Sequence, residues 1–215
     1  MAHSDTESLS AMARGIFSEA WAQVMQAAAA GPLEDALEDT LLRHAVRVAM
    51  TSATKTYRYV LPTQLCAKLA DDALDCRSIQ KNSGYPGSFD ARSLCDAVIV
   101  PFDRNNNGVL GGSPEPYVNN PLRVPAIAAQ HTPAMKDKQT WDALIVVLGA
   151  VEGRQDPVFT AEVFRQTLIE IHRRLADVAV LYPAPPRVSL ERCIQVTRTF
   201  LDESSGGARP QAVVC

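Results

Sequence analysis

Apolar side chains recur every three to four residues through most of this 215-residue chain, and this spacing constrains its fold more than any other feature. In the segment 138–154 the apolar stripe consists of Trp141, Leu144, Val147, Leu148 and Val151. This period places side chains on one face of an α-helix. Strand-like runs are weak, the best being residues 97–102, "AVIVPF". We therefore expect a mainly α fold, a multi-helix bundle with little or no sheet and one long ordered loop.

Glycine, proline and polar clusters divide the chain into segments. Helices are predicted over residues 10–30, 33–50, 62–75, 90–100, 138–154, 160–182 and 189–203, and residues 51–60 are expected to continue in helical form after a break. Pro62 fits the first turn of its helix. Asp90 is expected to cap a helix that ends before Pro101.

The segment 33–50 carries two further signals. Its apolar face is predicted to contain Leu37, Leu41, Ala45 and Val48. Its acidic residues come first and its basic residues last, an order that suits the helix dipole.

Three stretches organise the chain. Residues 1–60 hold N-terminal helices, residues 61–130 hold helices and the loop, and residues 131–215 hold C-terminal helices; we expect all three to pack as one domain. Near the end, the Gly-rich turn "SSGGARP" is followed by the start of an apolar run, "AVVC". This pattern is compatible with a natural end, and at least as well with a longer protein that continues beyond residue 215.

The N-terminus and the cysteines indicate a compartment. The start "MAHSDTESLS" lacks the basic and apolar regions of a secretory signal, and no apolar run reaches the ~18 residues of a membrane helix. The five cysteines form no CxxC pair, so we expect free and mostly buried thiols in a reducing environment. These features predict a cytoplasmic protein with no membrane contact.

Charge is uneven along the chain. The net charge of −3 argues against a basic field over the whole molecule. Residues 1–50 carry three basic and seven acidic groups, whereas residues 51–130 carry eight and seven and residues 131–215 carry ten of each. A polyanionic partner would therefore meet a local patch in the middle or C-terminal part.

The stretch 101–125, "PFDRNNNGVLGGSPEPYVNNPLRVP", is rich in Asn, Gly and Pro and lies between apolar segments. Asp103, Asn105, Asn107 and Gly108 match the first half of a calcium-binding loop. The acidic ligand expected at position 12 is missing, because Pro114 stands there. Asn-rich turns form for plain geometric reasons, so we favour a structural turn over a metal site.

Motifs for other chemistries are absent from the sequence. The histidines and cysteines lack zinc-ligand spacing, and there is no GxSxG, no GxGxxG, no phosphate-binding GK[ST] and no E-x-K of a metal-dependent nuclease. We nominate no catalytic residue, no metal ligand and no cofactor within this chain.

What the loop and the preceding helix offer is recognition chemistry. The candidate DNA-binding residues are Arg92, Ser93, Arg104, Asn105, Glu115, Tyr117, Asn119, Asn120 and Arg123. Arginine can bind phosphate or guanine, and Asn, Glu and Tyr can read bases or shape the loop. The alternative is a polar surface loop whose Asn side chains cap its own turns. The residues by themselves leave both interpretations open.

Three segments carry a resemblance: "LPTQLCAKLADDALDCRSIQ", "GSFDARSLCDAVIVPF" and "LGGSPEPYVNNPLRVP". In this order they resemble the N-terminal part of the SacI-type restriction endonuclease family, over about residues 61–125. The resemblance implies the non-catalytic portion of a bacterial restriction–modification enzyme used in phage defence. The Mg²⁺-dependent nuclease domain would then lie beyond residue 215.

The resemblance implies double-stranded DNA as partner, bound by this portion for cleavage by the missing domain. An alternative is a helical scaffold or dimerisation module that supports the nuclease domain without contacting DNA. A homodimer is compatible with either.

Overall fold

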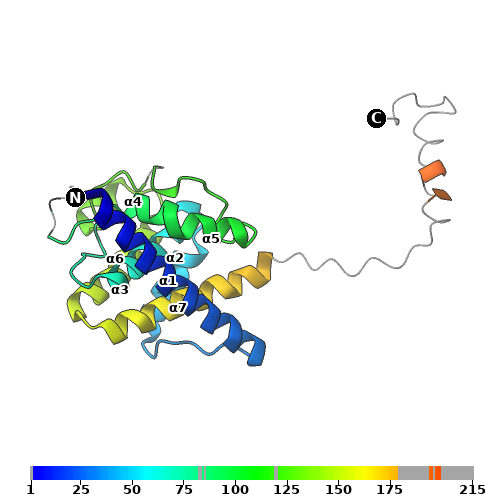
Figure 1. Cartoon of the computed structure of the whole chain (residues 1–215), viewed down its shortest axis with the longest axis horizontal. Coiled ribbons are helices and arrows are strands. Elements are labelled where there is room, and N and C mark those ends of the chain that lie inside the picture. The colour runs from blue at the N-terminus through cyan, green and yellow to red at the C-terminus, as the bar shows by residue number, and fades with distance from the viewer. Residues whose placement is uncertain are drawn as a thin grey trace, which may run out of the picture. The chain divides into compact units, whose positions relative to one another are not determined.

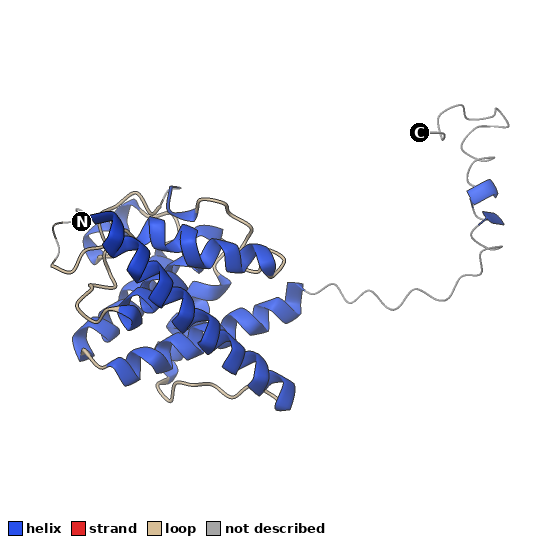
Figure 2. Ribbon diagram, viewed as in Figure 1, coloured by secondary structure: helices blue, strands red, loops and turns tan. Residues whose placement is uncertain are grey.

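Helices account for nearly all the regular structure of the computed structural model, which describes residues 2–81, 84, 86–118, 121–178, 194–195 and 197–199. The α-helices are α1 (Ala2–Ala30), α2 (Thr40–Thr51), α3 (Val60–Ala70), α4 (Ala91–Leu94), α5 (Val100–Asn105), α6 (Lys138–Arg154) and α7 (Pro157–Val178). Short helical turns are η1 (Lys55–Tyr59), η2 (Cys95–Ile99), η3 (Pro116–Val118) and η4 (Ala129–Ala134). The described part contains no strand, only an isolated bridge between Ser78 and Ala126, so the mainly α prediction is confirmed (Figure 2).

Contacts divide the chain into residues 1–179 and residues 180–215. Within the first unit, α3 lies among α1, α6 and α7, and α2 packs on α6 and α7 (Figure 1). Every residue of α3 from Val60 to Lys68 is buried, as expected for a helix surrounded by others. Most of the helix predicted over 189–203 lies outside the described residues.

Several predicted boundaries are confirmed. Helix α6 has the bounds expected from its apolar stripe, and α1 ends where Gly31 and Pro32 predicted, although it begins at Ala2. Pro62 lies in the first turn of α3, which ends at Ala70 and not at residue 75. The polar segment after α3 turns back on itself where Gly87 accepts a hydrogen bond from the backbone N–H of Asp75 at 2.9 Å.

The helix predicted over 33–50 begins only at Thr40. The carboxylate of Asp39 caps it by accepting hydrogen bonds from the N–H groups of Leu41 at 2.9 Å and Leu42 at 3.0 Å. The predicted apolar face was wrong, since Leu41 is 80% exposed. The face that packs on the core contains Leu42, Ala45, Val46, Ala49 and Met50.

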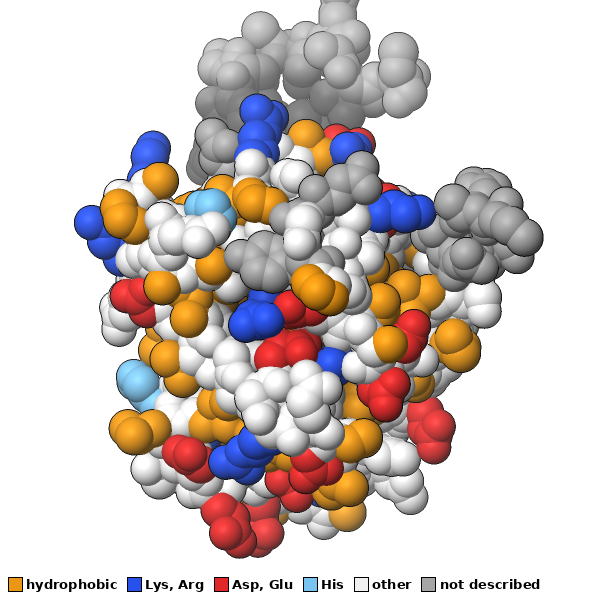
Figure 3. Space-filling view, turned by 90° about the vertical axis from the view of Figure 1, so that its left-hand side faces the viewer, with side chains coloured by type: hydrophobic (Ala, Val, Ile, Leu, Met, Phe, Trp, Pro, Cys, Tyr) orange, Lys and Arg blue, Asp and Glu red, His pale blue; other side chains and the backbone are white. Residues whose placement is uncertain are grey.

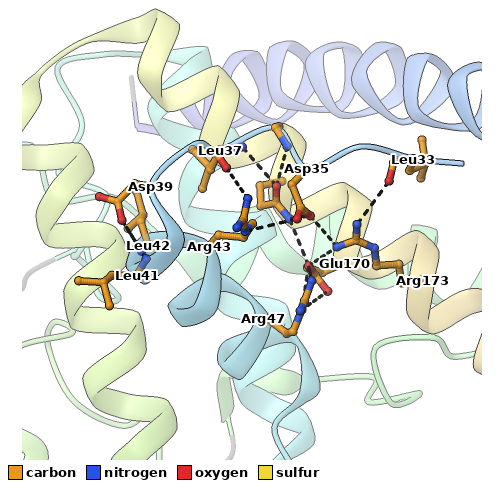
Figure 4. Close-up of polar contacts among 12 residues, drawn as sticks. Leu33, Asp35, Leu37, Asp39, Leu41, Leu42, Arg43, Arg47, Glu170 and Arg173 are labelled. Carbon is orange, nitrogen blue, oxygen red and sulfur yellow. Dashed lines mark hydrogen bonds and ion pairs between the residues drawn. The ribbon is translucent and has the colours of Figure 1, made fainter.

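The acidic residues at 34, 35 and 38 therefore do not belong to a helix, and the dipole argument fails for them. Asp35 instead joins an ion network with α7, in which the Arg173 guanidinium lies between the Asp35 and Glu170 carboxylates at 2.8 and 2.7 Å (Figure 4). Arg43 binds the second oxygen of Asp35 at 3.3 Å. The side-chain oxygen of Gln166 accepts the N–H of Ala36 at 2.7 Å. These contacts hold the segment extended along α7.

The helix predicted to end before Pro101 continues to Asn105. Pro101 has no N–H to donate to the carbonyl of Ala97, and its ring crowds that carbonyl. The π-helical turn η2 precedes it, and Arg14 of α1 donates to the Ala97 oxygen at 3.1 Å. A wider turn and a tertiary hydrogen bond thus let the helix pass through proline, and the loop starts five residues later than predicted.

The thiols of Cys66, Cys76 and Cys95 are free and buried, as predicted. Burial raises the pKa of Cys66 to about 12, so this thiol stays protonated at neutral pH. Among the described residues, no helix combines the length and the apolar character needed to cross a membrane.

Candidate nucleic-acid interface

The turn at residues 106–113 is built around the side chain of Asp103, which is 2% exposed. One carboxylate oxygen accepts the N–H of Leu110 at 2.6 Å. The other accepts the N–H of Gly112 at 2.9 Å and the hydroxyl of Tyr59 at 2.5 Å. Left-handed backbone at Asn107 and Gly108 closes the turn.

This arrangement explains the half-matched calcium motif. Both carboxylate oxygens of Asp103 accept hydrogen bonds from backbone N–H groups or from a hydroxyl of its own chain. The described residues contain no group of three or more His, Cys, Asp or Glu side chains that could hold a metal ion. Residues 106–113 thus form a turn closed by hydrogen bonds to Asp103, and the absence of a metal site stays a prediction.

Four cations surround the same turn, and we call Lys55, Arg58, Arg104 and Arg174 the turn cluster. Arg58 is buried and donates to the carbonyl oxygens of Ser52, at 2.8 Å from Nε, and Leu110, at 3.4 Å from Nη1. Arg174 donates to the oxygen of Val109 at 2.6 Å. Burial, with a smaller effect of the nearby Arg174, lowers the pKa of Arg58.

The other two members of the cluster point their charges to solvent. The aliphatic part of the Lys55 side chain packs on Gly111, where an added Cβ would lie 2.9 Å from the Cβ of Lys55. Arg104 lines a small cavity of about 350 Å³ together with Gly108, Gly112 and Ser113. Its guanidinium forms no hydrogen bond or ion pair with another described residue, so it is available to a ligand.

A second cleft, of about 420 Å³, begins beside Lys55. We call it the Tyr57 cleft; it is lined by Thr54, Tyr57, Pro121, Arg123, Val124, Ala134, Met135, Lys136 and Asp137. The Nε of Arg123 donates to the oxygen of Val118 at 2.8 Å, which fixes the side chain at the cleft. Arg123 and Lys136 are both exposed.

The other residues predicted from the sequence to bind DNA lie in different environments. Arg92 pairs with Glu115 at 3.5 Å and Asp96 at 3.8 Å, and all three are solvent-accessible. The Ser93 hydroxyl donates to the carboxylate of Asp90 at 2.7 Å, as part of the predicted cap of α4.

Asn105 is exposed at the end of α5. Tyr117 is buried, and burial raises its pKa well above the ordinary value, so it is a core residue and not a surface for bases. Asn119 and Asn120 lie outside the described residues.

Lys55, Tyr57, Arg58 and Arg174 were missed by sequence reasoning. The first three share the short stretch "TKTYRYV", where basic and aromatic residues alternate, and that pattern was the available signal. Arg174 had none, because its role depends on α7 lying beside the turn. On the face shown in Figure 3, Lys and Arg gather toward the upper part and Asp and Glu toward the lower part.

Comparison with known proteins gives one family. A family model described as the SacI restriction endonuclease N-terminal domain matches residues 12–172. A search of curated proteins gave no match. The matched region contains α3, the helix through Pro101 and the loop, which are the segments that carried the resemblance, and it spans well over half of the chain. This chain therefore belongs to the SacI restriction endonuclease N-terminal domain family.

Proposed function

We propose that this chain is the DNA-recognition part of a SacI-like restriction enzyme. It binds double-stranded DNA, and a nuclease domain beyond residue 215 cleaves it. The observation that carries the proposal is the turn cluster. Cations from η1, α5 and α7 converge on one turn, although the net charge of the chain is −3.

The geometry suits a phosphate backbone. The buried Arg58 and the partly buried Arg174 hold the turn by its carbonyl groups, while Lys55 and Arg104 leave their charges free in solvent. Asp103, the carboxylate at the centre, is covered and already bonded to three donors. Phosphate contacts of this kind fix the register of a protein on DNA.

In this proposal, polar side chains near the turn cluster recognise the bases. Asn105, Arg123 and the Arg92–Glu115 pair are exposed next to this surface or along the same loop. Asn119 and Asn120 stay predicted base contacts. We expect the Mg²⁺ that cleavage requires to be bound by the nuclease domain.

Fluorescence anisotropy with a labelled duplex tests the proposal. Binding should be measurable at low salt, and log K should fall linearly with log salt concentration. The double variant Lys55→Ala/Arg104→Ala should weaken binding and reduce the magnitude of the slope by about 2, because each of the two lost phosphate contacts contributes ~0.9.

The double variant Lys138→Ala/Arg165→Ala is the matched control. It removes the same charge from exposed positions outside the turn cluster. No duplex binding at low salt, or an equal loss in both double variants, would contradict the proposal.

A second candidate is the scaffold or dimerisation module. It is favoured by the hydrogen bonds that Arg58, Arg123 and Arg174 donate to backbone carbonyl oxygens. A loop that supports its own protein would use its arginines for such internal contacts. Light scattering that finds a dimer, combined with anisotropy that finds no DNA affinity, would support this candidate over the first.

A further inference from the structure

The Tyr57 cleft has a partly apolar wall. Pro121, Val124 and Met135 line it, and the ring of Tyr57 packs against Trp141 with 5.9 Å between ring centroids. Trp141 is fully buried, so the wall is backed by the core. A flat aromatic ligand could lie against such a surface, and a cleft of about 420 Å³ is within the size range of small-molecule sites.

Tyr57 also brings an unused hydrogen-bonding group to this cleft. The residue is 1% exposed, and its hydroxyl has no hydrogen-bond partner among the described residues. Burial and the neighbouring carboxylate of Asp137 raise its pKa, so the hydroxyl keeps its proton at neutral pH. Buried polar groups are seldom left unpaired, and one that is unpaired beside a cleft suggests a missing ligand.

The polar side of the cleft is oriented as well. Asp137 is fixed by hydrogen bonds from the Thr140 hydroxyl at 2.6 Å and the Ser52 hydroxyl at 2.8 Å. Arg123 is held through Nε, which leaves its other guanidinium nitrogens without a partner among the described residues. Lys136 is exposed at the cleft. Two cations thus lie beside a partly apolar wall, and a nucleotide, with a flat base and charged phosphates, can use both.

We propose that the Tyr57 cleft takes one unpaired nucleotide of a DNA strand. The base lies against the apolar wall with the Tyr57 hydroxyl as hydrogen-bond donor, and the adjoining phosphates contact Arg123 and Lys136. This inference rests on the proposed DNA-recognition function. The two surfaces are continuous, because Thr54 of the cleft precedes Lys55 of the turn cluster. The hydroxyl is covered, so a base reaches it when a neighbour moves, and the flexible Met135 lies in the same wall.

Duplexes with a single extra nucleotide test this inference. In a one-nucleotide bulge the cost of unstacking and unpairing a base is largely met before binding. The chain should bind at least one of the four base bulges about tenfold more tightly than the fully paired duplex. A bulge with an abasic residue has a similar bend but no base, and it should bind no better than the paired duplex.

Two variants connect the preference to the cleft. Tyr57→Phe should reduce the preference for the base bulge toward one while leaving affinity for the paired duplex unchanged. Lys136→Ala should weaken binding of the bulged duplex more than Lys138→Ala, which removes an exposed charge that does not line the cleft.

The outcomes separate the two proposals. Equal affinity for base and abasic bulges, or an unchanged preference in Tyr57→Phe, overturns the nucleotide site and leaves DNA recognition standing. Absence of binding to every duplex overturns the DNA-recognition function itself.

Discussion

The hydroxyl of Tyr59 donates a hydrogen bond to the carboxylate of Asp103 across 2.5 Å, and both side chains are buried. The same hydroxyl accepts the N–H of Ser113 at 2.8 Å. Tyr59 thereby joins η1, α5 and the last residue of the turn. Four predictions follow from this and similar contacts, each with a partner variant or a paired condition as its control.

Tyr59→Phe should lower the free energy of unfolding by about 1–3 kcal/mol, because it leaves a buried carboxylate and a backbone N–H each short of a partner. Tyr57→Phe is the matched control, since it removes a buried hydroxyl that has no partner among the described residues. It should be neutral or stabilising. Urea unfolding followed by circular dichroism measures both. Equal destabilisation by the two variants would show that the Tyr59 hydrogen bonds contribute little.

Calcium should not stabilise the chain. The Asp103 oxygens are occupied by Leu110, Gly112 and Tyr59, and calcium could displace these donors only by opening the turn. Melting temperatures in about 5 mM Ca²⁺, above the Kd range of most calcium loops, should match those in EDTA. Asp103→Asn should lower the melting temperature equally in both solutions. A calcium-dependent rise that Asp103→Asn abolishes would restore the metal-loop interpretation.

Stability should fall in acid. Although burial opposes the shift, hydrogen bonds or ion pairs lower the pKa values of Asp35, Asp75 and Asp137 below the ordinary aspartate value of 3.8. A lowered pKa in the folded state adds stability that is complete above the unfolded pKa and is lost as pH falls through the folded one. The urea midpoint should therefore decline below about pH 4.

Asp137 allows this acid sensitivity to be assigned. Asp137→Asn should destabilise the chain at neutral pH and flatten its acid decline, because hydrogen bonds from Thr140 and Ser52 favour the charged form. Asp72→Asn makes the same charge change at an exposed position and should leave the curve as in the wild type. Parallel acid declines in all three proteins would argue against the role given to Asp137.

Gly87→Ala should destabilise the chain more than Gly84→Ala. Both glycines have positive φ, 74° and 80°, so both substitutions strain the backbone. Only at Gly87 would the new Cβ meet neighbours, 2.3 Å from the oxygen of Ala73 and 2.8 Å from the nitrogen of Asp75. The clash should add about 1–3 kcal/mol to the loss measured for Gly84→Ala in thermal or urea unfolding. Similar losses for both variants would mean that the chain after α3 yields easily.

The candidate site was predictable only where a local pattern carried it. Arg104 and Asn105 were nominated from the sequence and are exposed beside the turn. Tyr117 was nominated to read bases or shape the loop, but its ring is in the core. Arg174 joins the turn cluster from 65 residues away, across a fold that no local pattern encodes.

The spacing of apolar side chains and the order of short motifs are local properties. They were therefore enough to predict the helical class, the bounds of α6, the family, and the buried thiols of Cys66, Cys76 and Cys95. The start of α2 depends on the tertiary fold, since the ion network with α7 makes the extended segment around Asp35 the better partner. The tertiary fold also explains why the helix passes through Pro101, because Arg14, 83 residues away from Ala97, donates to the carbonyl that proline leaves free. Long-range contacts of this kind can outweigh local preference, and that is why they lie beyond a sequence pattern.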